Sequence, residues 1–332
     1  MLDRRQLVLG AAGLAGAIAL PRRAAYGQSA WTPARPVTIV VPYPAGGAVD
    51  VLTRILAEAI QGALGQSVVV ENQPGASGAV GTRRVARAEP DGHTLVLSTN
   101  QTHATNISLL PDGGGYDPVK DFAALGGLAD LQHLLVVRKD LAAASVPEFL
   151  AFAKSSGREL TCASTGPGSA SHLTMELFRA KTGLNLVHVP YRGAAPMLQD
   201  LLGGRVDLSF ATVPTVLGQV QGGELRALAV ASPRTSPHLP NLPTLAAAGV
   251  AGVEADAWCA IFAPAGTAQP IRERYRDLIK TALDRAEVQA NIAKQGMSLN
   301  WREPDAFAVF QREEVTRWAE IIKTAKSEPL KP

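Results

Sequence analysis

Two glycine-rich segments carry the residue types that could do chemistry. The stretch from Leu160 to Phe178, "LTCASTGPGSASHLTMELF", passes from an apolar run through small residues into a helical pattern. The stretch "VPYPAGGAVD" has the same order after the apolar run at Val37. Such a junction can hold a nucleophile, a phosphate or a carboxylate, because the first N–H groups of a helix are unpaired and attract negative charge.

Phosphate binding has weak support in the sequence. No G-x-x-x-x-G-K-[ST] motif occurs, and "GPGSAS" has a serine where the dinucleotide fingerprint needs its third glycine. No acidic residue stands at a suitable strand end about twenty residues later. The sequence therefore predicts neither a nucleotide nor a dinucleotide cofactor.

A serine nucleophile is the main alternative from another class of protein. Ser169 follows Gly168, but Ser171 stands where the G-x-S-x-G motif requires glycine. His172 is near in sequence, whereas a triad histidine usually comes from a distant loop. A serine hydrolase using Ser169 and His172 is therefore the second hypothesis.

Metal binding is not indicated. The chain has six histidines, and no pair of them has H-E-x-x-H or H-x-H spacing. We predict no metal and no cofactor.

A carboxylate fits the two segments best. Glycines let a ligand approach the backbone, and serine and threonine hydroxyls add donors without adding charge. If the two segments face each other across a cleft, each helix start takes one carboxylate, so the predicted ligand is a dicarboxylate.

Each polar residue in these segments also has a simpler explanation. Asp50 and Ser169 suit helix N-caps, and Tyr43 and Tyr191 suit half-buried aromatic positions. Arg192 suits a surface ion pair of little energetic value. Asp207 suits the edge of a strand. The binding hypothesis is favoured because these features recur together in both halves.

Strands alternate with helices through most of the chain. The apolar runs predict strands at Val37–Val41, Val68–Val70, Thr94–Leu97, Leu160–Ala163, Val187–Val189, Val206–Phe210 and Leu225–Val230. Helical spacing follows several of them, and Gly65 and Gly183 end two of the helices. This alternation predicts α/β layers with mixed, mostly parallel sheets. Residues 134–141 and 255–267 suggest extended connections that form a hinge between two lobes.

The N-terminus resembles an export signal. Residues 1–27 combine a basic start, an apolar run too short to cross a bilayer and a small-residue cleavage region. Arg4-Arg5 suggests the twin-arginine route, while a Sec signal and a membrane anchor are the alternatives. Of 32 basic and 29 acidic residues, this segment holds four and one, which leaves 28 of each. A neutral mature chain gives no support for nucleic-acid binding.

Two cysteines, Cys162 and Cys259, lie in apolar runs. Buried free thiols are the favoured prediction, with a disulfide as the alternative that an exported protein permits.

Seven motifs in order resemble one known family. They are "VPYPAGGAVDVLTR", "VENQPGASGAVGT", "PDGHTLVLST", "STGPGSASHL", "HVPYRGAAPMLQDLLGGRVDLSF", "LPNLPTLAAAGV" and "FAPAGT". Together they resemble the Bug family, the extracytoplasmic substrate-binding proteins of tripartite tricarboxylate transporters. The resemblance covers essentially the whole mature chain, although Asn100–His103 is more polar than is typical.

The resemblance implies a two-lobed, type II periplasmic-binding-protein fold with a Venus-flytrap hinge. Lobe 1 is expected at 31–130, lobe 2 at 131–257, and a return strand with C-terminal helices completing lobe 1 at 258–332. The implied protein is a periplasmic, non-catalytic monomer that binds a small organic acid and docks on a membrane permease. A binding protein that feeds a two-component sensor is a further alternative.

The resemblance also implies which residues bind the ligand. They comprise the first glycine-rich loop, the second-lobe segment that includes Gly168 to His172, and several cleft positions. The set is Tyr43, Ala45, Gly46, Gly47, Asp50, Ser77, Thr99, Thr165, Gly168, Ser169, Ser171, His172, Tyr191, Arg192, Gly193, Asp207, Phe210, Ala211 and Thr212.

Overall fold

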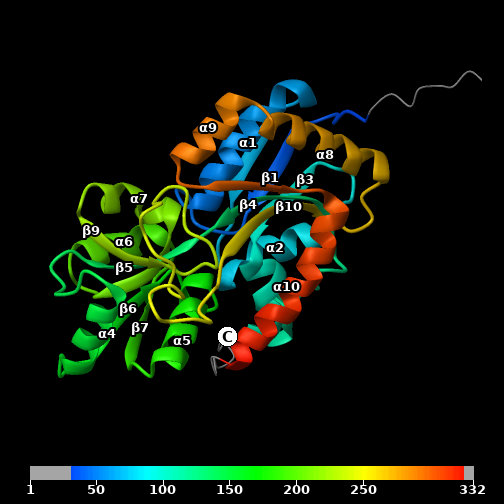
Figure 1. Ribbon diagram of the computed structural model, residues 1–332. Coiled ribbons are helices and arrows are strands. Elements are labelled where there is room, and N and C mark those ends of the chain that lie inside the picture. Colours follow the sequence, from blue (N-terminus) through cyan, green and yellow to red (C-terminus); the bar gives the residue numbers. More distant parts are fainter. Residues whose placement is uncertain (1–30, 325–332) are drawn as a thin grey trace, which may run out of the picture. The chain divides into compact units, whose positions relative to one another are not determined.

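The chain builds two mixed β-sheets with helices packed on them (Figure 1). The computed structural model describes residues 31–324, which belong to one compact unit. The export signal predicted at residues 1–27 lies outside the described residues. The six-stranded sheet has the order β11-β4-β10-β3-β1-β2, and the five-stranded sheet has the order β7-β6-β8-β5-β9.

The bounds of the elements follow from the hydrogen-bonding pattern. The strands are β1 (Val37–Val41), β2 (Val68–Asn72), β3 (Thr94–Thr99), β4 (Phe122–Leu131), β5 (His133–Arg138), β6 (Leu160–Ser164), β7 (Leu186–Pro190), β8 (Leu208–Thr212), β9 (Leu225–Val230), β10 (Ala257–Pro264) and β11 (Ser298–Arg302). The α-helices are α1 (Ala48–Leu64), α2 (Ala79–Ala86), α3 (Asn106–Leu109), α4 (Val146–Ser155), α5 (Ala170–Thr182), α6 (Ala194–Leu202), α7 (Val213–Gln221), α8 (Gln269–Leu283), α9 (Ala286–Lys294) and α10 (Pro304–Thr324). Short helices are η1 (Ala76–Gly78), η2 (Gln101–Thr105) and η3 (Pro111–Gly114).

Parallel pairing occurs in the strand–helix units of each sheet. β1 pairs in parallel with β2 and β3, and β6 pairs in parallel with β7 and β8. Of the nine strand pairings in the described residues, these four are parallel and five are antiparallel: β10 with β3 and β4, β11 with β4, and β5 with β8 and β9. The sheets are therefore mixed, as predicted, but not mostly parallel, because β4, β5 and β10 run against their neighbours. The carboxyl ends of parallel strands share one edge of a sheet, so the loops and helix starts that follow them also gather there.

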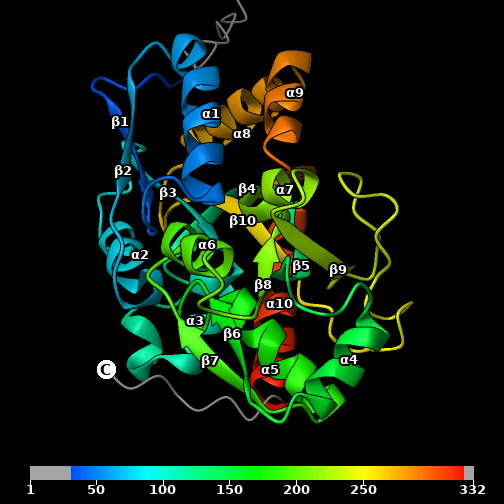
Figure 2. The same cartoon turned by 90° about the vertical axis from the view of Figure 1, so that its left-hand side faces the viewer.

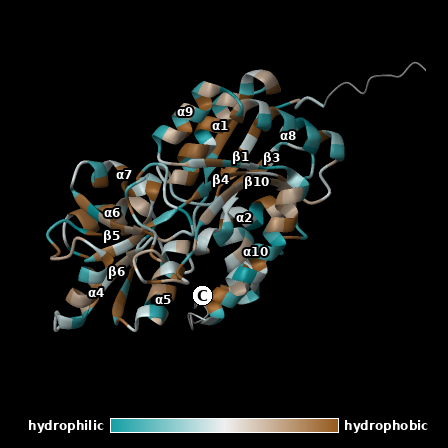
Figure 3. Ribbon diagram, in the orientation of Figure 1, coloured by the Kyte–Doolittle hydropathy of each residue, from teal (hydrophilic) through white to brown (hydrophobic). Residues whose placement is uncertain are grey.

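Amphipathic helices cover the sheets. In α1 the side chains of Leu52, Leu56, Ile60 and Leu64 are buried at a spacing of four residues, and Gly65 ends the helix in a left-handed conformation. The helix packs on α8 and α9. Hydrophilic and hydrophobic residues alternate along α10 in the same way (Figure 3).

The two segments predicted as extended connections, 134–141 and 255–267, are in fact strands inside the sheets, β5 and β10. β4 ends at Leu131 in the first sheet, and β5 begins at His133 in the second. β10 begins at Ala257 and lies in the first sheet between β3 and β4. Sequence periodicity identified these runs as extended, but only long-range pairing makes them central strands. The predicted lobe boundaries at 130/131 and 257/258 stay a prediction.

One predicted strand is displaced. Apolar residues predicted a strand at Val206–Phe210, whereas β8 is Leu208–Thr212. Val206 is buried in the core, and the Asp207 carboxylate accepts hydrogen bonds from Arg158 and from the Thr161 N–H. Val206 is apolar because it is buried, although it lies before β8. The apolar pattern therefore predicted that the strand begins two residues too early.

Both cysteines are buried free thiols, as predicted. Cys162 lies in β6 of the second sheet and Cys259 in β10 of the first. Burial raises the pKa of each thiol. Across residues 31–324, no helix combines the length and the apolar character needed to cross a membrane.

Gly81 determines how closely α2 packs on the loop after β1. A Cβ atom at Gly81 would lie 2.7 Å from the Gln73 carbonyl oxygen and 3.2 Å from the Pro42 Cα. Gly81→Ala is therefore expected to reduce the free energy of unfolding by about 1–3 kcal/mol, measured by urea denaturation. Gly62→Ala is the control, because Gly62 is at an exposed position of α1 and nothing lies within 4 Å of the added Cβ. The control is expected to be neutral or to stabilise by up to about 1 kcal/mol, and equal effects of both variants would contradict the packing argument.

Candidate ligand-binding site

A cavity of about 160 Å³ lies between the strand–helix units of the two sheets. A cavity near 150 Å³ can hold a molecule as large as benzene, so this one suits a small metabolite. Its walls are Tyr43, Pro44, Ala45, Gly47, Ala48, Val49, Thr99, Asn100, Gln101, Leu131, His133, Thr165, Ser169, Ala170, Ser171, Arg192, Gly193, Ala194, Ala195, Pro196, Thr212, Thr215 and Ala257.

Four helices begin at this cavity. Their N-caps are Gly47 for α1, Ser169 for α5, Gly193 for α6 and Thr212 for α7, and all four residues line it. Each helix start carries unpaired N–H groups and a partial positive charge. The sequence pointed to two such ends, and tertiary structure adds those of α6 and α7. Figure 2 shows α1 approaching α6 and α7.

The first glycine-rich loop turns its acidic residue away from the cavity. The Asp50 carboxylate accepts hydrogen bonds from the Gly46 N–H and from Asn72 Nδ2, both at 2.9 Å, and its side chain is buried. Gly46 has a left-handed conformation, with a φ of 81°, and its N–H points toward the Asp50 carboxylate. Asp50 is therefore not among the lining residues and is not the N-cap either, since Gly47 precedes α1. With its oxygens occupied, Asp50 holds the loop in shape.

The second loop presents hydroxyl groups. Ser169 Oγ donates to the Gly166 carbonyl at 2.6 Å and lies 2.9 Å from Ser171 Oγ. Ser169 also accepts the His172 N–H at 3.3 Å, so it is an N-cap in addition to lining the cavity. The Thr165 N–H donates to Ser171 Oγ at 3.1 Å.

His172 does not line the cavity. Its Nδ1 accepts the Gly168 N–H at 3.1 Å, and its ring stacks on His188 with centroids 4.0 Å apart. Burial, with His188 and Arg179 nearby, lowers the pKa of His172 to about 3. The contact between Ser169 and His172 runs through the backbone N–H of the histidine, so the imidazole is not placed as a base for the serine. This geometry gives the hydrolase hypothesis no support.

Two predicted tyrosines have different surroundings. Tyr43 lines the cavity with its hydroxyl 2.7 Å from Thr99 Oγ1, and burial raises its pKa. Tyr191 donates to Asp200 at 2.7 Å and faces an adjoining cavity instead. Arg192 lines both cavities.

Gly168 does not line the cavity, and neither do three predicted residues at and before β8. Asp207 precedes β8, at the opposite end of the strand from Thr212, and its carboxylate accepts a hydrogen bond from Arg158. Phe210 is fully buried and packs on Phe178, and Ala211 is buried in the core of the second sheet. Only Thr212 of this run reaches the cavity, because it ends the strand.

Hydrogen bonds join the two sides of the cleft at its rim. Ser77 Oγ donates to the Pro167 carbonyl at 3.1 Å, and Thr105 Oγ1 donates to the Gly168 carbonyl at 3.4 Å. Ser77 lines the adjoining cavity of about 600 Å³. A Cβ at Gly193 would lie 3.2 Å from the Pro44 side chain. These contacts describe a closed cleft.

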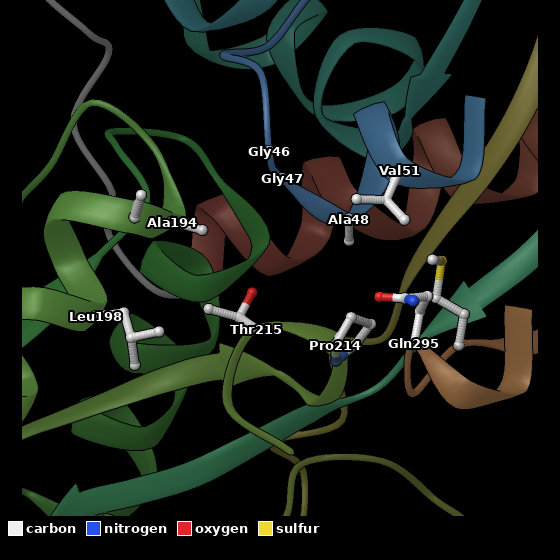
Figure 4. Close-up of a pocket in the computed structure, with 11 residues that line it drawn as sticks. Gly46, Gly47, Ala48, Val51, Ala194, Leu198, Pro214, Thr215 and Gln295 are labelled. Carbon is white, nitrogen blue, oxygen red and sulfur yellow. The ribbon is translucent and has the colours of Figure 1, made fainter. Parts of the chain in front are cut away.

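Another cavity of about 200 Å³ continues the cleft on the side of α9 (Figure 4). Gly46 and Gly47 line it from the first loop, and Ala48 and Val51 from α1. Ala194, Leu198, Pro214, Thr215 and Gln295 face them from the other elements around it.

Among the polar lining residues, sequence reasoning missed Asn100, Gln101, His133 and Thr215. The unusual polarity of Asn100–His103 was a signal for the first of these. Nothing local marked His133, which lies where the chain crosses between sheets.

A cavity ringed by the helix starts of two α/β units is the site of a solute-binding protein. Residues 52–326 match the family described as "Tripartite tricarboxylate transporter family receptor". The chain belongs to this family.

Individual relatives agree with that assignment. The chain is 37% identical to Protein BugT of Bordetella pertussis over 88% of this chain and 89% of BugT. It is similar to the structure of periplasmic binding protein BugD, with 35% identity, a TM-score of 0.83, and coverage of 89% and 99% of the two chains. It is also similar to R. palustris Rpa4515 with adipate, at 36% identity, a TM-score of 0.85 and coverage of 90% and 99%. These relatives are substrate-binding receptors and not enzymes, so the predicted family, fold class and lack of catalysis are confirmed.

The buried, neutral His172 predicts a pH-dependent stability. Its folded pKa lies below the ~6.5 of an unfolded histidine, so its contribution is complete above pH 6.5 and is lost as the pH falls toward 3. His172→Asn keeps an acceptor for the Gly168 N–H but cannot titrate. Between pH 7 and 4.5, urea denaturation is expected to show roughly 2 kcal/mol less loss of stability in the variant than in the wild type. The two proteins should be similar at pH 8, and identical slopes below pH 6.5 would contradict this assignment.

Proposed function

We propose that this protein is an exported, periplasmic receptor that binds a small di- or tricarboxylate and delivers it to the permease of a tripartite tricarboxylate-type transporter. The observation that carries the proposal is the convergence of four helix N-termini on one cavity. The family name supports transport, and the adipate of the Rpa4515 structure supports a dicarboxylate. We expect the mature receptor to be a monomer.

Backbone and hydroxyl donors replace cationic side chains in this site. Arg192 is the one charged side chain that lines the cavity among the described residues, and it is exposed. A charge-assisted hydrogen bond contributes ~1.5–3 kcal/mol. Four to six of these bonds, less the cost of ordering the ligand, reach the roughly −8 kcal/mol of a micromolar complex.

The proposed binding residues are those predicted positions that line the central cavity. They are Tyr43, Ala45, Gly47, Thr99, Thr165, Ser169, Ser171, Arg192, Gly193 and Thr212. Closure of the cleft is a shift of population toward a form in which the ligand contacts both sides.

A ligand panel tests the proposed class of ligand. Isothermal titration with aliphatic di- and tricarboxylates at several chain lengths is expected to give micromolar binding for at least one acid. The diamide of the same carbon skeleton is the control and is expected not to bind, because it carries no charge for the helix starts. Absence of binding by every acid, or equal binding of the diamide, would refute the proposal.

A pair of serine variants tests the position of the site. Ser169 and Ser145 are both N-caps that accept the N–H of the third helical residue, but Ser145 begins α4 and does not line the cavity. Both Ser→Ala changes are expected to reduce stability by about 1 kcal/mol. Only Ser169→Ala is expected to weaken binding of the acid, by about 1–3 kcal/mol. Equal affinities of the two variants would place the ligand elsewhere.

A further inference from the structure

Two side chains that line the central cavity carry buried polar atoms without a hydrogen-bond partner in the described residues. Asn100 lines it from the end of β3, and its side chain is 1% exposed. Neither Oδ1 nor Nδ2 of Asn100 has a hydrogen-bond partner among residues 31–324. Buried amides are almost always paired in folded proteins, so an unpaired one in a residue that lines a cavity points to a group supplied from outside the chain.

A second buried side chain in the same cavity has the same property. His133 is 2% exposed and lies at the start of β5, directly after the chain crosses between sheets. Its Nδ1 has no partner within the described part of the chain. Asn100 and His133 border the central cavity and neither adjoining one, so they form its inner wall.

The inner wall carries no charge. Burial lowers the pKa of His133 to about 4, and the Ala255 carbonyl offsets this only in part, so its imidazole is neutral at pH 7. A neutral imidazole has one donor and one acceptor, and an amide has two donors and an acceptor. A carboxylate only accepts hydrogen bonds, so it would leave Asn100 Oδ1 unpaired and would meet no positive charge here.

A hydroxyl group matches these atoms because it both donates and accepts. It can accept from Asn100 Nδ2 and donate to Asn100 Oδ1 or to His133 Nδ1, which is left as an acceptor when the other ring nitrogen donates to the Ala255 carbonyl. The carboxylates of the same molecule would remain at the helix starts on the walls of the cavity.

We propose that Asn100 and His133 recognise a hydroxyl group of the ligand, so that this receptor selects hydroxylated carboxylic acids over the same acids without the hydroxyl. This inference rests on the proposed function and names the substrate class within it.

The experiment compares acids that differ in one hydroxyl group. Both enantiomers of malate are compared with succinate, and citrate with tricarballylate, by isothermal titration. In at least one pair, the wild-type protein is expected to bind the hydroxylated acid about 10–100-fold more tightly, because the unhydroxylated acid leaves the inner wall unpaired.

Two variants locate this selectivity. Asn100→Leu and His133→Leu replace polar side chains with apolar ones, and each is expected to reduce the preference for the hydroxylated acid to less than about 3-fold. The loss should come from weaker binding of the hydroxylated acid, with succinate or tricarballylate little affected. Asn100→Ser replaces Asn100→Leu if the latter does not fold, and the same loss is expected.

His103→Phe is the matched control. His103 is also a buried histidine, and its Nε2 has no partner among residues 31–324, but its ring stacks on Phe262 with centroids 3.9 Å apart and it does not line the cavity. The control is expected to keep the wild-type preference.

The outcomes separate the two proposals. If unhydroxylated acids bind as tightly as hydroxylated ones, or if the preference survives in both Asn100 and His133 variants, the recognition of a hydroxyl is refuted while the carboxylate receptor stands. If no acid of either kind binds, the proposed function itself fails. A preference that collapses in the inner-wall variants and persists in His103→Phe supports the assignment.

Discussion

The alignment of helix starts with the carboxyl ends of parallel strands is the constraint on which the site depends. Every strand that precedes a helix of the site ends at the same edge of its sheet, so the unpaired N–H groups of several helices point at one small volume. This arrangement makes the cavity electropositive without buried lysine or arginine. It also explains the position of Asp50, whose negative charge would oppose an anion unless Gly46, Asn72 and Arg54 occupied its oxygens.

The same geometry links binding to closure. The cavity walls come from both sheets, and the rim is joined by bonds such as that of Ser77 to the Pro167 carbonyl. The segments that connect the sheets lie beside each other. The Ala231 N–H donates to the His133 backbone carbonyl, and the Ala255 N–H donates to the Ala231 carbonyl. A ligand that reaches His133 therefore contacts the place where the two sheets are connected.

Unpaired buried polar atoms make closure of the cleft costly in free energy unless a ligand pairs with them. Burying Asn100 and His133 without partners costs free energy, on the order of 1–3 kcal/mol for each lost hydrogen bond. If an opened cleft hydrates these atoms, a ligand that supplies the lost bonds favours closure. Such a differential interaction is what a population shift requires.

The sequence by itself determined the features that depend on neighbouring residues. The alternation of strands and helices, the helix ends at Gly65 and Gly183, the buried thiols and the loops around Gly47 and Ser169 all follow from local pattern, because propensity, capping and apolar spacing act over a few residues. The family resemblance also identified the fold class and the class of receptor.

Only the tertiary structure decided which side chains face the ligand. Asp207, Phe210 and Ala211 belong to the right segment, but the register of β8 turns them into the core or places them at the far end of the strand. Asn100 and His133 come from β3 and from the crossing into β5, more than thirty residues apart in the chain. They line one cavity because the two sheets, each built by pairing of strands distant in sequence, come together there, and no local pattern encodes that arrangement.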